Sequence, residues 1–262
     1  MLDVIGVSVI YSKGTPNETV ALNNASLSLK QGEAISLIGS NGAGKSTLQN
    51  AICGKAPVVS GSIFLDGADI TGAKDYKRSY DIGRVFQDPK LGTAPSLTIE
   101  ENLSLAYTRK ARKRLFALNK ADRAFFQSEL AQLGMGLEDR LGEKAGSLSG
   151  GQRQALALVM SVIANPKLLL LDEHTAALDP VAEEKITAIT QKIIAEKGIT
   201  AIMITHDISR ALAFGTRTVM MERGRILLEV SGGQRQSLGI EGLRKLFLQK
   251  ADRELTDDVM LL

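Results

Sequence analysis

The sequence predicts an α/β protein with a largely parallel sheet, because strand-like and helix-like segments alternate along it. Three short apolar runs read as buried strands: Ala34 to Gly39, Lys167 to Asp172 and Thr200 to Thr205. These runs are apolar almost throughout, as strands covered on both faces are. The stretch 91–147 instead lacks strand-like runs and is rich in Ala, Leu, Lys, Arg, Glu and Gln. It predicts a helical subdomain inserted into the α/β core.

Length and composition narrow the class of protein. A chain of 262 residues makes one large domain or a core with a subdomain, and its single cysteine, Cys53, excludes an internal disulfide. We expect Cys53 to be a small buried apolar residue. The longest apolar stretch, Ala155 to Ala164, is well short of the roughly 20 residues that span a bilayer. No signal peptide is recognised at the start. The net charge of +3 is too mild to indicate nucleic-acid binding.

The end of the chain predicts a hairpin and a helix. Thr218 to Glu222 and Arg225 to Val230 are strand-like and are separated by Arg223-Gly224, which predicts a hairpin. From Gly239 onward apolar residues recur at helical spacing, which predicts a C-terminal helix with a loose acidic tail.

A glycine-rich loop carries the strongest chemical signal. Residues 39–46, GSNGAGKS, fit the phosphate-loop pattern G-x-x-x-x-G-K-[ST] between an expected strand and an expected helix. Glycines let successive N–H groups turn toward one anion, and the helix N-terminus adds its positive dipole end. Lys45 is expected to reach the β- and γ-phosphates, and Ser46 to bind Mg²⁺. The nucleotide-binding residues expected here are Gly39, Ser40, Asn41, Gly42, Ala43, Gly44, Lys45, Ser46 and Thr47.

Four more motifs follow in a fixed order. They are VFQDP at 85–89, LSGGQ at 148–152, LLLLDE at 168–173 and THD at 205–207. With the phosphate loop, these motifs make the sequence resemble the ATP-binding subunits of ABC transporters. The resemblance covers about residues 3–230 and depends on five short motifs in the right order.

The resemblance assigns a role to individual residues. It makes Asp172 a Mg²⁺ ligand at a strand end, and Glu173 the carboxylate that orients the attacking water. It makes Gln87 a residue that senses Mg²⁺ and the water, and His206 a switch that bonds the γ-phosphate. Tyr11 fits the aromatic residue that stacks on adenine, although a tyrosine after a strand is equally explained by packing.

The LSGGQ motif implies a dimer. In the family it closes over the ATP held by the opposite subunit, through backbone N–H groups and a helix dipole. The implied machine is a head-to-tail dimer, of identical or similar chains, with two nucleotides at the interface. Asp179, at the end of the stretch 177–179, resembles the loop that crosses to the partner. The signature residues expected to bind ATP are Ser149, Gly150, Gly151 and Gln152.

The resemblance also implies an architecture. It is a P-loop NTPase (RecA-like) core with an N-terminal antiparallel β subdomain and an inserted α-helical subdomain. The expected bounds are 1–91 and 148–230 for the core, 92–147 for the helical subdomain, and 231–262 for a C-terminal helical extension.

The implied function is that of an ATPase subunit that couples hydrolysis of MgATP to solute transport through separate membrane permease subunits. Residues 88–98 would meet the permease, which places the subunit at the cytoplasmic face of the cell membrane. Import of an amino acid or related small solute is favoured, with an extracytoplasmic solute-binding protein as a further partner and no nucleic acid. EHT at 173–175 with MMERG at 220–224 resembles ATPases of branched-chain amino-acid-type permeases. Two alternatives stay open, an ABC exporter ATPase and a cytosolic ABC ATPase scaffold.

Several segments imitate or depart from these motifs. SGGQRQ at 231–236 repeats the signature, but we interpret it as a turn after the last strand. NKAD at 119–122 matches a guanine-reading motif but is better explained as a helix N-cap. His174 replaces the usual proline beside Glu173, either as a tolerated change or as a source of pH dependence. The basic run at 109–114 predicts a solvated helix face, with contact to anionic lipid as the alternative.

Overall fold

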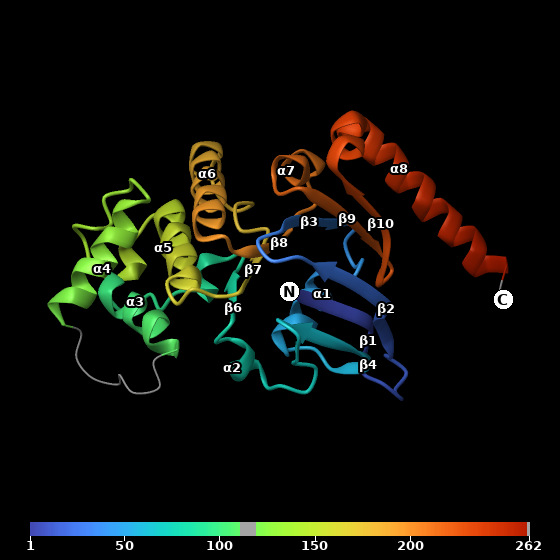
Figure 1. Cartoon of the computed structure of the whole chain (residues 1–262), viewed down its shortest axis with the longest axis horizontal. Coiled ribbons are helices and arrows are strands. Elements are labelled where there is room, and N and C mark those ends of the chain that lie inside the picture. Colours follow the sequence, from blue (N-terminus) through green and yellow to red (C-terminus); the bar gives the residue numbers. More distant parts are fainter. Residues whose placement is uncertain (111–118, 261–262) are drawn as a thin grey trace. The chain divides into compact units, whose positions relative to one another are not determined.

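The computed structural model describes residues 1–110 and 119–260 of the chain. These residues form two compact units. The first unit is Met1–Ser79 together with the chain from Thr200 onward, and the second unit is Tyr80–Ile199. Figure 1 shows the elements of both in the colours of the sequence. The bounds expected for the core and for the helical subdomain remain predictions.

An antiparallel sheet forms the N-terminal part of the first unit. Its strands lie in the order β2-β1-β4-β5. Alternate side chains of β1 are buried, including Val7 and Val9, so the sheet has one face on a core and one toward solvent. The bounds are β1 Leu2–Tyr11, β2 Thr19–Leu29, β4 Val58–Leu65 and β5 Ala68–Asp69.

The same unit contains the strand that leads into the phosphate loop. In it β3 pairs in parallel with β8 on one side and with β9 on the other, and β10 pairs antiparallel with β9. The three buried strands and the terminal hairpin predicted from the sequence are thereby confirmed, β7 being the strand in the second unit. The bounds are β3 Ala34–Gly39, β8 Thr200–Ile204, β9 Arg217–Glu222 and β10 Arg225–Ser231, with helices α1 Lys45–Cys53, α2 Asp75–Arg78 and α7 Ile208–Ala213.

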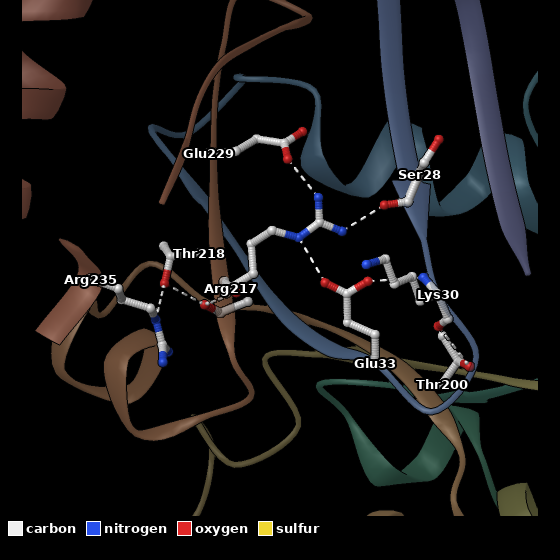
Figure 2. Close-up of polar contacts among 9 residues, drawn as sticks. Ser28, Lys30, Glu33, Thr200, Arg217, Thr218, Glu229 and Arg235 are labelled. Carbon is white, nitrogen blue, oxygen red and sulfur yellow. Dashed lines mark hydrogen bonds and ion pairs between the residues drawn. The ribbon is translucent and has the colours of Figure 1, made fainter. Parts of the chain in front are cut away.

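Arg217 joins strands of this unit that are far apart in the sequence (Figure 2). Its guanidinium donates to Glu33 Oε1 at 2.9 Å, to Glu229 Oε2 at 2.5 Å and to the carbonyl of Ser28 at 2.6 Å. These partners lie before β3, on β10 and on β2. The side chain is largely buried, so the pairs are well shielded from water. Arg217 therefore stabilises the position of β9 beside the strand of the phosphate loop.

The second SGGQRQ copy is helical, and the prediction of a turn there was wrong. Helix α8, Gly232–Met260, begins directly after β10 and is kinked at Gly239, whose φ is 57°. Arg235 explains the difference, because its buried guanidinium donates to Thr218 Oγ1 and to three carbonyl oxygens before β9. Beyond the kink, buried Leu243 packs with the core of the unit. The C-terminal helix is confirmed, but it continues to Met260 where a loose tail was expected.

The second unit consists of two parallel strands and several helices. Between 92 and 147 its described residues contain helices, turns and one isolated bridge, Thr98 with Lys144, which confirms the helical character expected there. Asn119 and Asp122 form a capping box at the start of α4, so the N-cap interpretation of NKAD is confirmed. In the basic run, residues 111–114 lie outside the described residues. The bounds are β6 Ile82–Val85, β7 Leu168–Asp172, α3 Ile99–Tyr107, α4 Lys120–Ala131, α5 Gly150–Val162 and α6 Pro180–Lys197, with short 3₁₀ turns at Pro89–Leu91, Thr108–Lys110 and Ala145–Ser147.

Candidate nucleotide site

The phosphate loop joins β3 to α1 as the sequence predicts. A Cβ on Gly39 would lie 2.2 Å from the carbonyl oxygen of Met221, so only glycine fits where β3 ends beside β9. Gly42 has φ 83° and open space on its Cβ side, which suits a loop that turns N–H groups toward a ligand. Gly44 has φ 100°, and its Cβ would lie 2.7 Å from the carbonyl oxygen of Ala21. The three glycines are thus each required by the backbone or by a close neighbour.

Two side chains hold the loop closed around itself. Lys45 is buried and its Nζ donates to the carbonyl oxygens of Gly39 and Ser40 at 2.8 and 2.9 Å. Ser40 Oγ donates to Glu222 Oε2 at 2.6 Å. Sequence reasoning missed Glu222; the signal was its place at the end of β9, whose Met221 is paired with Gly39. The start of α1 carries no acidic residue, so nothing there opposes a bound anion.

His206 lies at the same edge of the sheet as the phosphate loop. Leu37 of β3 is in register with Ile204 of β8, and the N–H of Thr205 donates to the carbonyl of Leu37 at 3.2 Å. Gly39 and His206 each lie two residues beyond this registered pair, and because the strands are parallel both lie at the same edge of the sheet. The imidazole is exposed there, and Asp207 directly after it caps α7. The structure therefore brings His206 and the loop together.

Tyr11 ends β1 in the same unit. Its side chain is 37% exposed, as a platform for a ring requires. Leu22 of β2 approaches Gly44 of the loop, and Leu22 is paired with Val9, two residues before Tyr11. The antiparallel sheet thus reaches the start of α1 close to the strand that carries Tyr11.

The expected Mg²⁺ ligand and the hydrolytic carboxylate lie together in the second unit. Strands β6 and β7 are parallel, with Val85 in register with Leu171, so Gln87 and Asp172 come after this pair at one edge. Glu173 adopts a left-handed φ of 42° directly after β7. Its carbonyl accepts a hydrogen bond from the N–H of Ala176 at 2.9 Å, which closes the turn. A strained non-glycine residue of this kind is frequent at functional sites.

His174 is buried behind this turn. Its side chain is 3% exposed, and Nε2 lies 3.1 Å from Thr190 Oγ1 on α6. Since the Thr190 hydroxyl donates to the carbonyl of Ile186 at 2.7 Å, it accepts from His174, which carries its proton on Nε2. This hydrogen bond links the turn that contains Glu173 to helix α6.

The signature segment caps α5. Ser149 Oγ accepts from the N–H of Gln152 at 3.3 Å, and Gln152 Oε1 accepts from the N–H of Ser149 at 3.2 Å. Arg153 clamps the preceding turn through the carbonyls of Ala145, Gly146 and Leu148. Ser149 and Gly150 remain exposed at the tip. The result is an internally capped helix N-terminus whose first residues, Ser149 and Gly150, are exposed.

The signature helix begins beside the start of α6. A Cβ on buried Gly151 would lie 3.1 Å from Cβ of Ala182, so the two helix starts pack closely. Asp179 caps α6 through the N–H of Ala182 at 3.0 Å and is exposed. The role of Asp179 at a partner subunit stays a prediction, while its role as a cap within the chain is observed.

The expected site residues fall into two groups, one in each unit. The phosphate loop, Tyr11 and His206 belong to the first unit, and Gln87, Asp172, Glu173, Asp179 and the signature to the second. Within 1–110 and 119–260, no three His, Cys, Asp or Glu side chains cluster as a metal site. Mg²⁺ fits the donors nonetheless, because hydroxyl, amide and carboxylate oxygens are what it binds along with phosphate oxygens. In the same ranges no helix is both long and apolar enough to cross a bilayer.

Comparisons with known proteins agree with these motifs. A family model described as ABC transporter matches residues 22–176. A tyrosine transport ATP-binding protein of Clostridioides difficile is 43% identical over 247 residues, covering 94% of this chain and 98% of the relative. A phosphonates import ATP-binding protein of Nostoc sp. is 35% identical and covers 80% of this chain and 85% of its own length.

Solved structures agree as well. The ATP-binding cassette MJ0796, in a dimeric post-hydrolysis state bound to ADP and Pi, superposes with a TM-score of 0.75 at 30% identity over 88% of this chain and 98% of that one. The cbiO1 protein of Clostridium perfringens, part of an ABC transporter complex, gives a TM-score of 0.77 at 29% identity over 94% of each chain. The chain belongs to the ABC transporter family of ATP-binding subunits and is an ATP hydrolase that uses Mg²⁺.

Proposed function

We propose that this chain is the ATPase subunit of an importer for a small solute, an amino acid or a related compound, which moves through separate permease subunits. Two copies of the chain, or one copy and a similar ATPase, close over two ATP molecules. One observation carries the dimer: the signature helix is capped internally, yet Ser149 and Gly150 at its tip are exposed and rigid. Such a tip is preorganised for an anion that comes from outside the chain. In the dimer, this tip contacts the phosphate of an ATP that the phosphate loop of the second copy holds.

The chain's own residues divide the work of hydrolysis. Loop N–H groups and Lys45 hold the β- and γ-phosphates and offset their charge. Glu173, directly after Asp172, holds the attacking water and accepts its proton; His206 bonds the γ-phosphate. Ser46, Asp172 and Gln87 would hold Mg²⁺, which would supply positive charge against the phosphate oxygens. The strained turn at Glu173 fixes the carboxylate, so positioning supplies part of the rate.

The names of relatives support import and the class of solute. Tyrosine, methionine and phosphonate appear in the names of proteins that are 34–43% identical to this chain. The relative named for tyrosine transport matches over almost its whole length. We therefore rank an amino acid first among solutes, and we retain a permease of the branched-chain type as the finer expectation.

Exposed apolar side chains support docking to a permease. Leu91, on the turn that follows Gln87, is 69% exposed, and Leu105 on α3 is 60% exposed. Both lie in the second unit, in or near the stretch 88–98 expected to meet the permease. Docking there puts the subunit at the cytoplasmic face of the membrane. An extracytoplasmic solute-binding protein completes the importer.

Replacing Glu173 tests the composite site. The Glu173→Gln variant should bind MgATP, lose nearly all turnover and run as a dimer in gel filtration with ATP but as a monomer with ADP. The matched control, Glu183→Gln on α6, should behave as wild type. A Glu173→Gln protein that hydrolyses ATP normally would show that another group positions the water.

Co-purification tests the partners. We expect the chain, extracted from membranes of its native host, to bring an integral-membrane permease, and Leu91→Glu with Leu105→Glu to lose it while retaining ATP binding. Retention of the permease by that double variant would contradict the docking surface. A soluble assembly scaffold in place of a permease would contradict transport itself.

A further inference from the structure

An arginine faces the expected Mg²⁺ ligand from the neighbouring strand. Arg84 lies on β6 in register with Leu170 of β7, so alternation puts Arg84 and Asp172 on the same face of the pair. The guanidinium Nη2 is 3.0 Å from Asp172 Oδ2, and the two side chains are only 13% and 20% exposed. A charge-assisted pair this sheltered is screened far less than a surface pair.

The residue after this strand fixes the arginine from the other side. The Arg84 guanidinium carbon lies 4.8 Å from the centre of the Phe86 ring, within cation–π range. Phe86 is itself held, because Gln154 Nε2 donates to its carbonyl oxygen at 3.2 Å. Gln154 is fully buried on α5, the signature helix. Arg84 thus stands in a frame that joins β7, the segment before Gln87, and α5.

The positive charge of Arg84 determines how strongly Asp172 binds a metal ion. A guanidinium on one carboxylate oxygen orients the group, which favours a metal, but it also places a positive charge beside a divalent cation. A neutral or anionic group that hydrogen-bonds to a metal ligand raises the affinity of the site for the metal, because it orients the ligand. Here Arg84 and the metal are both cations in a site sheltered from water. Their repulsion costs more binding free energy than the orientation of the carboxylate gains. The net effect is a weaker hold on the metal.

We propose that Arg84 is a positioning residue that lowers the affinity of Asp172 for Mg²⁺ and keeps the segment before Gln87 aligned with it. The inference rests on the proposed role of Asp172. Its consequence is that Mg²⁺ and ADP leave together more readily after hydrolysis than they would from an unpaired carboxylate. Arg84 touches neither nucleotide nor water in this assignment, so it acts only through Asp172 and Phe86.

Linkage between Mg²⁺ and ADP tests this without turnover. The measured quantity is the ratio of ADP dissociation constants without Mg²⁺ and with saturating Mg²⁺, from calorimetric titration of the full chain. Arg84→Met, which keeps length and removes charge, should raise this ratio about fivefold or more, the factor that corresponds to roughly 1 kcal/mol. Arg84→Lys, which keeps the charge, should stay within about twofold of wild type by the same conversion.

The Asp172→Asn variant distinguishes a wrong role for Arg84 from a wrong assignment of Asp172. It should clearly reduce the ratio, and Arg84→Met should then have no further effect in the double variant. An unchanged or lower ratio in Arg84→Met, or an effect that persists without Asp172, overturns the role of Arg84 while leaving the proposed function intact. A ratio that survives Asp172→Asn overturns the assignment of Asp172 instead. Melting curves of each variant with and without ADP show that the binding values come from folded protein.

Discussion

Arg235 offers a quantitative test of how the C-terminal extension is held. Its buried guanidinium donates to the carbonyl oxygens of Ala211, Phe214 and Gly215 and to Thr218 Oγ1. Burial lowers the pKa of Arg235, yet a guanidinium remains charged at neutral pH. These carbonyls lie on α7 or directly after it, and α7 begins two residues after His206, so the contact stabilises both α8 and α7.

The magnitude follows from the partners. A hydrogen bond from a charged donor contributes about 1.5–3 kcal/mol net, but four bonds from one group are not additive. Removing the donor leaves several buried acceptors without it, and at about 1–3 kcal/mol for each such group we expect a loss of at least about 3 kcal/mol. At about 2–4 °C per kcal/mol for a protein of this size, we expect Arg235→Met to lower Tm by about 10 °C.

Thermal and urea unfolding followed by circular dichroism measure this loss. The matched control is Arg244→Met, an exposed arginine on the same helix, expected to change stability by less than about 0.5 kcal/mol. Arg235→Lys should recover only part of the loss, because an ammonium cannot serve several carbonyls in the fork geometry of arginine. An Arg235→Met protein as stable as the Arg244→Met control would refute the reasoning.

Three further predictions concern the motifs. Ser149→Ala or Gly151→Val should abolish most ATPase activity, whereas Gln234→Ala in the second SGGQRQ copy should leave it intact; equal losses in a steady-state assay would mean that both copies bind ATP. Gly39→Ala should lower the free energy of unfolding, measured in urea, by about 3 kcal/mol or more, because the new Cβ would meet the Met221 carbonyl. Wild-type stability of this variant would show that β9 can shift. Thr190→Val should lower kcat more than it changes KM, with Thr190→Ser restoring it, because Thr190 holds His174 next to Glu173; a change confined to KM would contradict that link.

Local sequence patterns predicted the strand ends and the loop, whereas contacts between distant segments decided the rest. The pattern around Lys45 and the apolar run before Asp172 are local signals, and both predicted the observed elements. The helix at Gly232 depends on Arg235 reaching carbonyls before β9, which no local pattern shows. The pairing of Arg84 with Asp172 depends on the register of two strands 88 residues apart. Such partners become visible only when the strands are aligned.

His174 shows a different kind of limit. Its neighbourhood in the sequence favoured a tolerated change over a functional one and could not show what the side chain contacts. The structure places it in a buried contact with Thr190 on α6, a partner 16 residues away. A proline there could make no such hydrogen bond. The substitution is therefore part of the packing behind the Glu173 turn.

Cross-linking between two variants tests most directly whether each ATP is held by two copies of the chain. Cys53, the only cysteine, is buried and is replaced by serine. One protein then carries Asn41→Cys in the exposed phosphate loop and the other Ser149→Cys at the signature tip, both with Glu173→Gln. A short bismaleimide should join the two proteins, distinguishable by size tags, in the presence of MgATP and not with ADP. The absence of a cross-linked heterodimer with MgATP would contradict the composite site. So would equal cross-linking within a single chain that carries both cysteines, measured at a dilution where the protein is monomeric.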